Sequence, residues 1–162
     1  MGSANSREGG CACGAVRYRL ESAPYFVNCC HCSWCQRETG SAFAVNATIE
    51  ADRVTLLQGR PETVLTPSAS GKGQKIVRCP RCHVALWSHY AGGGDFISFV
   101  RVGTLDNAAD FRPAAHIFTS TKQPWVVLPP DAQVFLEFYD PRIVWPPESL
   151  VRWKAARAKA AS

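Results

Sequence analysis

Eight cysteines in three tight groups constrain this 162-residue chain more than any other feature of its sequence. The N-terminal stretch MGSANSREGG has neither the apolar core nor the cleavage site of an export signal, so we expect a cytoplasmic protein with reduced thiols. Clustered thiolates in such a protein are typical metal ligands. The groups are Cys11-Ala-Cys13, Cys29-Cys30-His31-Cys32-Ser-Trp-Cys35 and Cys79-Pro-Arg-Cys82.

Length and charge exclude several other classes of protein. The length suits one domain over residues 1–162, and no apolar run approaches the ~18 residues of a membrane-spanning helix. The formal net charge of +5 would fall to about +2 if seven cysteines ionised on two zinc ions. We therefore expect no membrane or nucleic-acid partner, and we interpret the basic C-terminal residues as the solvated face of a docking helix: Arg152, Lys154, Arg157 and Lys159.

Hydrophobic patterning predicts a mainly β domain. Val16, Tyr18 and Leu20 alternate with charged residues over positions 15–21, which is typical of a half-buried strand. Further extended segments, separated by Gly- and Pro-rich turns, favour antiparallel pairing. They cover residues 43–50, 54–58, 63–66, 75–78, 84–90, 96–105 and 116–121. We expect helix only at residues 33–38 and at about 147–160, where Leu150 and Trp153 form a short apolar stripe.

The first and last cysteine groups together can form one closed metal site. A Cys-x-x-Cys turn such as Cys79 to Cys82 presents two sulfurs to one ion. Cys11 and Cys13 lie two apart, so on an extended segment they share a face. Four thiolates complete a tetrahedron, and we expect such a saturated site to be structural.

The middle group offers only three well-spaced thiolates, from Cys30, Cys32 and Cys35. Three protein ligands with an open fourth position are typical of reactive zinc. The alternative is an inert four-ligand site completed by Cys29 or by one of the histidines. If the segment is extended, His31 points away from Cys30 and Cys32, which favours a place behind the ligands or at the surface. The histidines are His31, His83, His89 and His116.

The order of these motifs resembles the glutathione-dependent formaldehyde-activating enzymes, a family that includes centromere protein V. The resemblance runs from about residue 10 to 125 and implies a β-tent fold around a structural zinc on Cys11, Cys13, Cys79 and Cys82. It implies a second, more labile zinc on Cys30, Cys32 and Cys35. The matching motifs are Gly10-Cys-Ala-Cys-Gly-Ala-Val-Arg-Tyr18, Cys30-His-Cys-Ser-Trp-Cys-Gln-Arg37, Gly40-Ser-Ala-Phe43, Cys79-Pro-Arg-Cys82, Leu86-Trp87 and His116-Ile-Phe-Thr-Ser-Thr-Lys-Gln-Pro-Trp125.

The resemblance also implies an activity: a carbon–sulfur lyase that joins glutathione to formaldehyde as S-(hydroxymethyl)glutathione, or acts on a related thiol adduct. Arg37, Lys122 and Trp125 are then candidate contacts for the carboxylates of glutathione. The alternative is a non-catalytic zinc-stabilised binding module, either a thiol carrier or a chromatin-type partner. The chain departs from the family at His83, where glycine is common, and we expect this imidazole to pack against its neighbours.

Overall fold

The computed structural model describes residues 7–68 and 70–161. Within them the strands form a three-stranded sheet and an eight-stranded sheet. The smaller sheet is antiparallel and has the order β1-β2-β5, with β1 Glu8–Gly10, β2 Arg17–Leu20 and β5 Val54–Gln58. Residues 1–6, on which the expectation of a missing export signal mainly rests, lie outside the described part.

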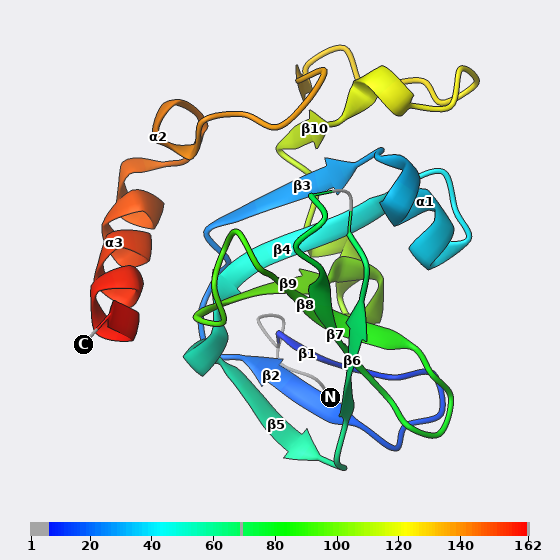
Figure 1. Cartoon of the computed structure of the whole chain (residues 1–162), viewed down its shortest axis with the longest axis vertical. Helices are drawn as coiled ribbons and strands as arrows, with labels where there is room; N and C mark the ends of the chain where they lie inside the picture. The colour runs from blue at the N-terminus through cyan, green and yellow to red at the C-terminus, as the bar shows by residue number, and fades with distance from the viewer. Residues whose placement is uncertain (1–6, 69, 162) are drawn as a thin grey trace.

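The larger sheet has the strand order β11-β10-β3-β4-β9-β8-β7-β6. Along this order, each strand from β3 through β4, β9, β8 and β7 pairs antiparallel with the next, as far as β6. Strand β10 instead runs parallel to both β3 and β11 (Figure 1). The strands are β3 Phe26–Cys30, β4 Ala44–Glu50, β6 Glu62–Thr66, β7 Gln74–Arg78, β8 Ala85–Tyr90, β9 Ile97–Arg101, β10 Ala115–Ile117 and β11 Gln133–Val134.

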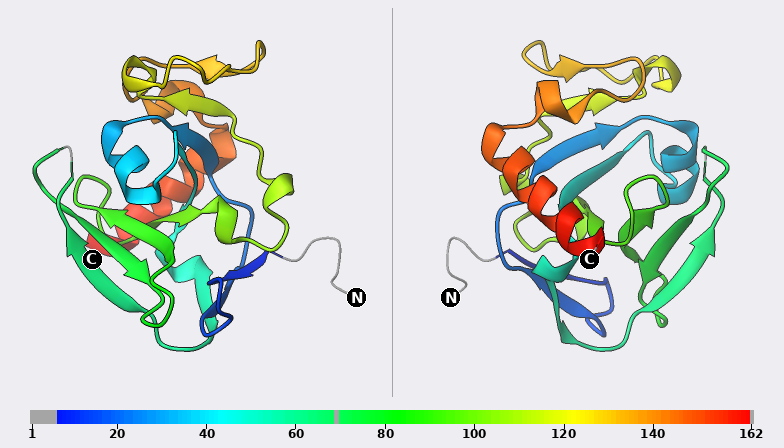
Figure 2. Two further views of the ribbon diagram at one scale, coloured as in Figure 1. Left: turned by 90° about the vertical axis from the view of Figure 1, so that its right-hand side faces the viewer. Right: turned by 60° about the vertical axis from the view of Figure 1, so that its left-hand side comes forward.

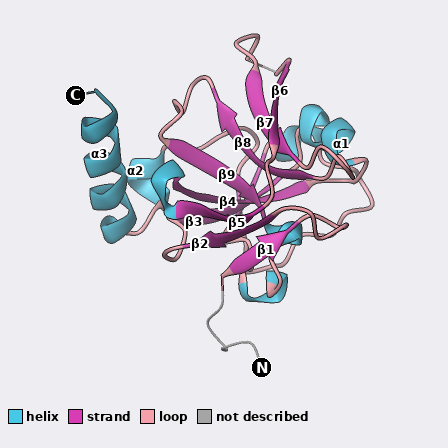
Figure 3. Cartoon of the chain, turned by 90° about the horizontal axis from the view of Figure 1, so that it is seen from below, coloured by secondary structure: helices cyan, strands magenta, loops and turns pink. Residues whose placement is uncertain are grey.

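Two α-helices flank the strands on opposite sides, as the view from below shows (Figure 3). Helix α1, Ser33–Thr39, begins after Cys32 and ends at Gly40, whose φ of 63° lets its N–H reach the Gln36 carbonyl. Helix α3, Pro147–Ala161, runs along the other side (Figure 2) and follows the short helix α2, Pro141–Val144. No helix formed by residues 7–68 and 70–161 combines the length and hydropathy needed to cross a lipid bilayer.

Two hydrophobic clusters hold the elements together, and each contains cysteines. The first lies between the sheets and includes Cys11 and Cys79 with Tyr18, Leu20 and Ile49 among its members. The second lies beneath the C-terminal segment and includes Cys30 and Cys35. Around them pack Phe26, Tyr139 and Trp145, with Leu150 and Trp153 of α3 at the margin. Residues after 125 therefore complete the core around the middle cysteine group.

The prediction of a mainly β fold with a C-terminal helix is confirmed, and both predicted helices are present. Two strands are shorter than predicted. Strand β9 ends at Arg101 because Val102–Thr104 forms a 3-10 turn. Strand β10 ends at Ile117 because Phe118 adopts a left-handed conformation, φ 54°, and a second 3-10 turn follows. Strand β3 was not predicted, since all five of its residues are buried and show no alternation.

Candidate metal centres

Four sulfur atoms from two turns far apart in the sequence meet in one group: those of Cys11, Cys13, Cys79 and Cys82 lie within 4.8 Å of one another. The Cys11 and Cys13 sulfurs are 3.6 Å apart, and those of Cys13 and Cys79 are 3.8 Å apart. Tetrahedral zinc with Zn–S bonds of ~2.3 Å requires sulfur separations of about 3.8 Å. The donor set and its spacing fit a closed tetrathiolate site.

Backbone amides favour the ionised form of these sulfurs. The N–H of Val16 donates to Cys11 Sγ at 3.3 Å, and the N–H of Arg81 donates to Cys79 Sγ at 3.4 Å. A hydrogen bond from the Val84 backbone is the largest effect on Cys82 and lowers its pKa to about 6. Thiolates are therefore favoured at Cys11 and Cys82, whereas burial and the neighbouring sulfurs outweigh the Ala15 amide at Cys13 and raise its pKa to about 11.

The second group joins the end of β3 to the start of α1. Cys30 is the last residue of the strand, Cys32 caps the helix by accepting the Cys35 N–H at 3.3 Å, and Cys35 lies in the first turn. Hydrogen bonds from the Cys30 and Cys35 thiols lower the pKa of Cys32, whereas the pKa values of Cys30 and Cys35 are raised. The group contains these three cysteines and no fourth donor from the described residues.

Arg101 is a buried cation beside this group. Its side chain is 7% exposed and donates to Ser88 Oγ at 2.9 Å and to Asn46 Oδ1, both neutral partners. Its Nε has no hydrogen-bond partner, and no carboxylate of residues 7–68 or 70–161 pairs with it. The pKa of Cys35 is raised to about 11: a hydrogen bond with Cys30 lowers it, but the Cys32 sulfur and burial raise it more, and the nearby Arg101 charge is a small opposing effect. A buried charge requires a partner of opposite charge. For Arg101 that partner would be the cysteine thiolates or a bound anionic ligand.

A cleft of about 470 Å³ lies between α1, the start of β4 and the loop before β8. Arg78 and Arg101 both contribute to its wall, together with Glu38, Phe43 and Cys82. Glu38 neutralises Arg78 by an ion pair, which leaves Arg101 as the unpaired cation on this wall. The three cysteines of the second group do not line the cleft, but its wall residue Ala44 pairs with Cys30 across β3 and β4.

Sequence reasoning missed a third group, made of Cys29, His31 and His116. Of the two places expected for His31, behind the ligands or at the surface, the surface is wrong: its side chain is fully buried and its Nε2 is 2.9 Å from His116 Nδ1. Strand β10 carries His116 to this place by pairing parallel with β3. Cys29 and His31 lie two residues apart, so on an extended segment they share a face. This spacing could have indicated from the sequence that they lie together.

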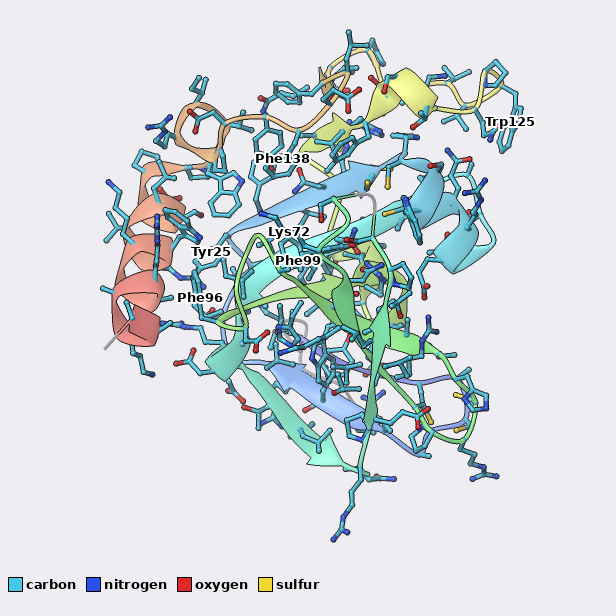
Figure 4. The ribbon with its side chains drawn as sticks, viewed as in Figure 1. Tyr25, Lys72, Phe96, Phe99, Trp125 and Phe138 are labelled. Atoms are coloured by element: carbon cyan, nitrogen blue, oxygen red, sulfur yellow. The ribbon has the colours of Figure 1, made fainter. Side chains whose placement is uncertain are left out.

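The candidate carboxylate contacts do not converge on the cleft. Arg37 is exposed on α1, and Lys122 donates its Nζ to the carbonyls of Gln123 and Val126. Trp125 is 72% exposed at the tip of its loop, far from the sheet centre (Figure 4). Gln123 Nε2 bonds Gln36 Oε1 at 2.7 Å, so this loop is nevertheless fastened to α1.

His83 adopts a left-handed conformation with φ 59°, and its side chain is 73% exposed. The expectation that the imidazole packs against its neighbours is therefore wrong. The conformation follows from the tight turn after Cys82, in which the His83 N–H bonds the Cys79 carbonyl at 2.9 Å. Glycine adopts this backbone without strain, whereas a side chain does not.

Comparisons with known proteins identify the family of this chain. The sequence profile of the family "Glutathione-dependent formaldehyde-activating enzyme" matches residues 6–121. A Halomonas elongata protein described as "Putative glutathione-dependent formaldehyde-activating enzyme" is 36% identical over 84 residues. The alignment spans about half of each protein, 49% of this chain and 54% of the relative. A crystal structure of a Rhodobacter sphaeroides protein superposes with a TM-score of 0.48 and 22% identity, over 62% of this chain and 88% of that one. This chain belongs to the glutathione-dependent formaldehyde-activating enzyme family.

Proposed function

We propose that this chain is a zinc-dependent carbon–sulfur lyase that adds the thiolate of glutathione, or of a related small thiol, to formaldehyde. The product with glutathione is S-(hydroxymethyl)glutathione. Family membership supports the pair of substrates. The single observation that carries the proposal is the three-cysteine group, which has no fourth donor among residues 7–68 and 70–161, because that donor set leaves a position for an incoming thiol.

The two cysteine groups would have different roles. Cys11, Cys13, Cys79 and Cys82 would hold a structural zinc inside the first hydrophobic cluster. Cys30, Cys32 and Cys35 would hold the second zinc, which supplies a Lewis-acidic position that lowers the pKa of a bound thiol. The caps and amide hydrogen bonds already place the three sulfurs, so little of the chain has to be reordered on loading.

Arg101 would compensate the charge that accumulates when the substrate thiol ionises. Its guanidinium is buried, lies near Cys35 and pairs with no carboxylate in the described part of the chain. In such a weakly screened place an oriented cation stabilises a developing anion more than it would in water. Arg37, Lys122 and Trp125 remain proposed contacts for the carboxylates of glutathione, since their loop and α1 are tied together through Gln36.

The reaction balances without an oxidant or reductant. The thiolate sulfur attacks the carbonyl carbon of formaldehyde and forms the new C–S bond, while the carbonyl π electrons move to oxygen. That oxygen takes a proton from solvent and becomes the hydroxyl group of the adduct. Addition also proceeds without protein, so the enzyme hypothesis requires a measured acceleration.

Exchange NMR with ¹³C-formaldehyde and glutathione measures that acceleration directly. We expect the zinc-loaded protein to raise the exchange rate between free aldehyde and adduct. Chelation under mild conditions should release the zinc of the three-cysteine group and abolish the effect, while the structural zinc of the four-cysteine group stays bound until the fold is lost. Glutathione should bind the fully loaded form and lose affinity after the first zinc has left.

Two pairs of variants separate the roles. Cys32→Ser should keep the fold and one zinc but lose acceleration, whereas Cys13→Ser should lose the fold itself. Arg101→Gln should reduce acceleration by about 10-fold or more, the effect of removing one electrostatic contact to a developing charge. Arg112→Gln is its matched control, because Arg112 lies at the surface in an ion pair with Asp131 and should leave the rate unchanged.

The proposal fails if both zinc ions resist chelation equally and glutathione does not bind. Binding without acceleration would instead support the non-catalytic thiol carrier. The chromatin-type alternative has less support, because Arg152 and Lys159 of the basic C-terminal run already pair with Glu50 and Asp52.

A further inference from the structure

We propose that Cys29, His31 and His116 form a third metal site, separate from the two cysteine groups, which takes one monovalent copper ion. Their ligand atoms lie within 4.8 Å of one another. Cys29 Sγ is 3.6 Å from His31 Nε2, and His31 Nε2 is 2.9 Å from His116 Nδ1. One thiolate and two imidazoles are a ligand set for copper or zinc.

The fold builds this group from two strands. Cys29 and His31 lie two residues apart at the end of β3, so their side chains leave the strand on one side, and Cys30 leaves on the other. The parallel pairing of β10 with β3 sets His116 directly beside Cys29. The same alternation that separates Cys29 from Cys30 therefore separates this group from the three-cysteine group.

All three side chains are buried, so the group is not a chance cluster of surface side chains. Cys29 is 1% exposed, His31 0% and His116 8%. The group is polar, enclosed and incompletely satisfied by the protein.

Hydrogen bonding within the group cannot satisfy its members together. Both close contacts converge on a single atom, His31 Nε2, from Cys29 and from His116. That nitrogen carries either one proton or one lone pair, so it makes only one strong hydrogen bond in its plane. An ion placed among the three ligand atoms accepts a lone pair from each of them.

Coordination number and charge favour a monovalent ion. Zinc is almost always four-coordinate, whereas this group offers three donors and is closed to solvent. One thiolate with Cu⁺ makes a neutral centre, while the same ligands with Zn²⁺ keep a net charge of +1. A buried centre that keeps an unpaired net charge costs free energy, which favours the neutral one. Thiolate is also a soft ligand that selects Cu⁺.

The test uses the full chain loaded with two zinc ions and titrated with Cu⁺ under anaerobic conditions, in the presence of bicinchoninate as a competing chelator. We expect one tightly bound copper per chain with no release of zinc. X-ray absorption at the copper edge should show one sulfur and two nitrogen neighbours. This measurement needs no variant, so the proposal stays testable if a variant fails to fold.

Variants then assign the ligands. Cys29→Ala and His116→Gln should each weaken copper binding by 10-fold or more and leave two zinc ions in place. The matched control is His83→Asn, which removes an exposed imidazole outside the group and suits the left-handed backbone; it should bind copper like the wild type. Displacement of zinc by copper, an all-sulfur copper shell, equal binding by the variants, or a third equivalent of zinc at this group would overturn the proposal.

Discussion

Arg152 fastens helix α3 to the β-domain, and its removal should have a large effect on stability. It donates to both carboxylate oxygens of Glu50, at 2.9 and 2.5 Å, and to the Ala23 carbonyl and Ser22 hydroxyl, each at 2.9 Å. Its guanidinium also lies 4.8 Å above the ring centre of Tyr25. The Glu50 side chain is only 6% exposed, so Arg152→Ala leaves a buried carboxylate behind.

The magnitude follows from that buried charge. Breaking a buried ion pair by removing one partner typically costs about 3–5 kcal/mol. The Arg152 side chain is 25% exposed and Arg53 remains 3.4 Å from Glu50, so we place the loss at the lower end, about 3 kcal/mol. For a chain of this size that corresponds to a fall in Tm of about 6–12 °C.

The assay is urea and thermal unfolding of the zinc-loaded protein at neutral pH, followed by circular dichroism. Lys159→Ala is the matched control, since it removes the same charge from the same helix but breaks an exposed pair with Asp52; we expect a loss of less than about 1 kcal/mol. Adding Glu50→Gln to Arg152→Ala should recover about 1–2 kcal/mol, because no buried charge is then left unpaired. Equal destabilisation by Arg152→Ala and Lys159→Ala would refute the reasoning.

Three further predictions concern the tyrosines, His83 and the structural site. Burial raises the pKa of all four tyrosines, to about 12 for Tyr18. Tyrosines of the unfolded chain ionise near pH 10. The neutral rings therefore stabilise the folded state fully below pH 10, and this contribution is lost as pH rises through the folded pKa values. At pH 10, absorbance at 295 nm should therefore show almost no tyrosinate in the native protein but about half ionisation in the urea-unfolded protein. Native tyrosines that titrate near pH 10 would contradict this prediction. His83→Gly should raise the free energy of unfolding by about 0.5–1 kcal/mol through release of left-handed strain, whereas His89→Gly in strand β8 should lower it, both measured in urea. Stripping zinc from the four-cysteine group should unfold the domain, since such sites contribute on the order of 10 kcal/mol, and a chelated protein that keeps its native near-ultraviolet spectrum would argue against a structural role.

Local pattern predicts a strand best where one of its faces is buried and the other is not. Strand β2 is the clearest case, with Tyr18 and Leu20 buried while Arg19 is exposed. The same logic fails for β3, where every residue is buried between β4 and β10. It also fails for α2 and β11, which are only four and two residues long and leave no period to detect.

The cysteine spacing indicated which sulfurs come together, because pairs two or three residues apart share a turn or a face. Contacts over long separations could not be predicted in the same way. His31 and His116 are 85 residues apart and meet through a parallel pairing that no local pattern encodes. The sequence also gave no indication that Arg101 matters. What sets it apart is that no carboxylate of the described residues pairs with it, and only the folded structure shows this.

Strand β3 acts as a partition between two kinds of chemistry. Cys30 leads to an all-sulfur group on one side, and Cys29 and His31 lead to a mixed nitrogen and sulfur group on the other. Because side chains alternate along a strand, inserting or deleting a single residue between Phe26 and Cys29 would exchange the two sides in one step. Variation in the length of this segment is therefore far more disruptive than substitution within it, and natural insertions should be confined to the turn before β3.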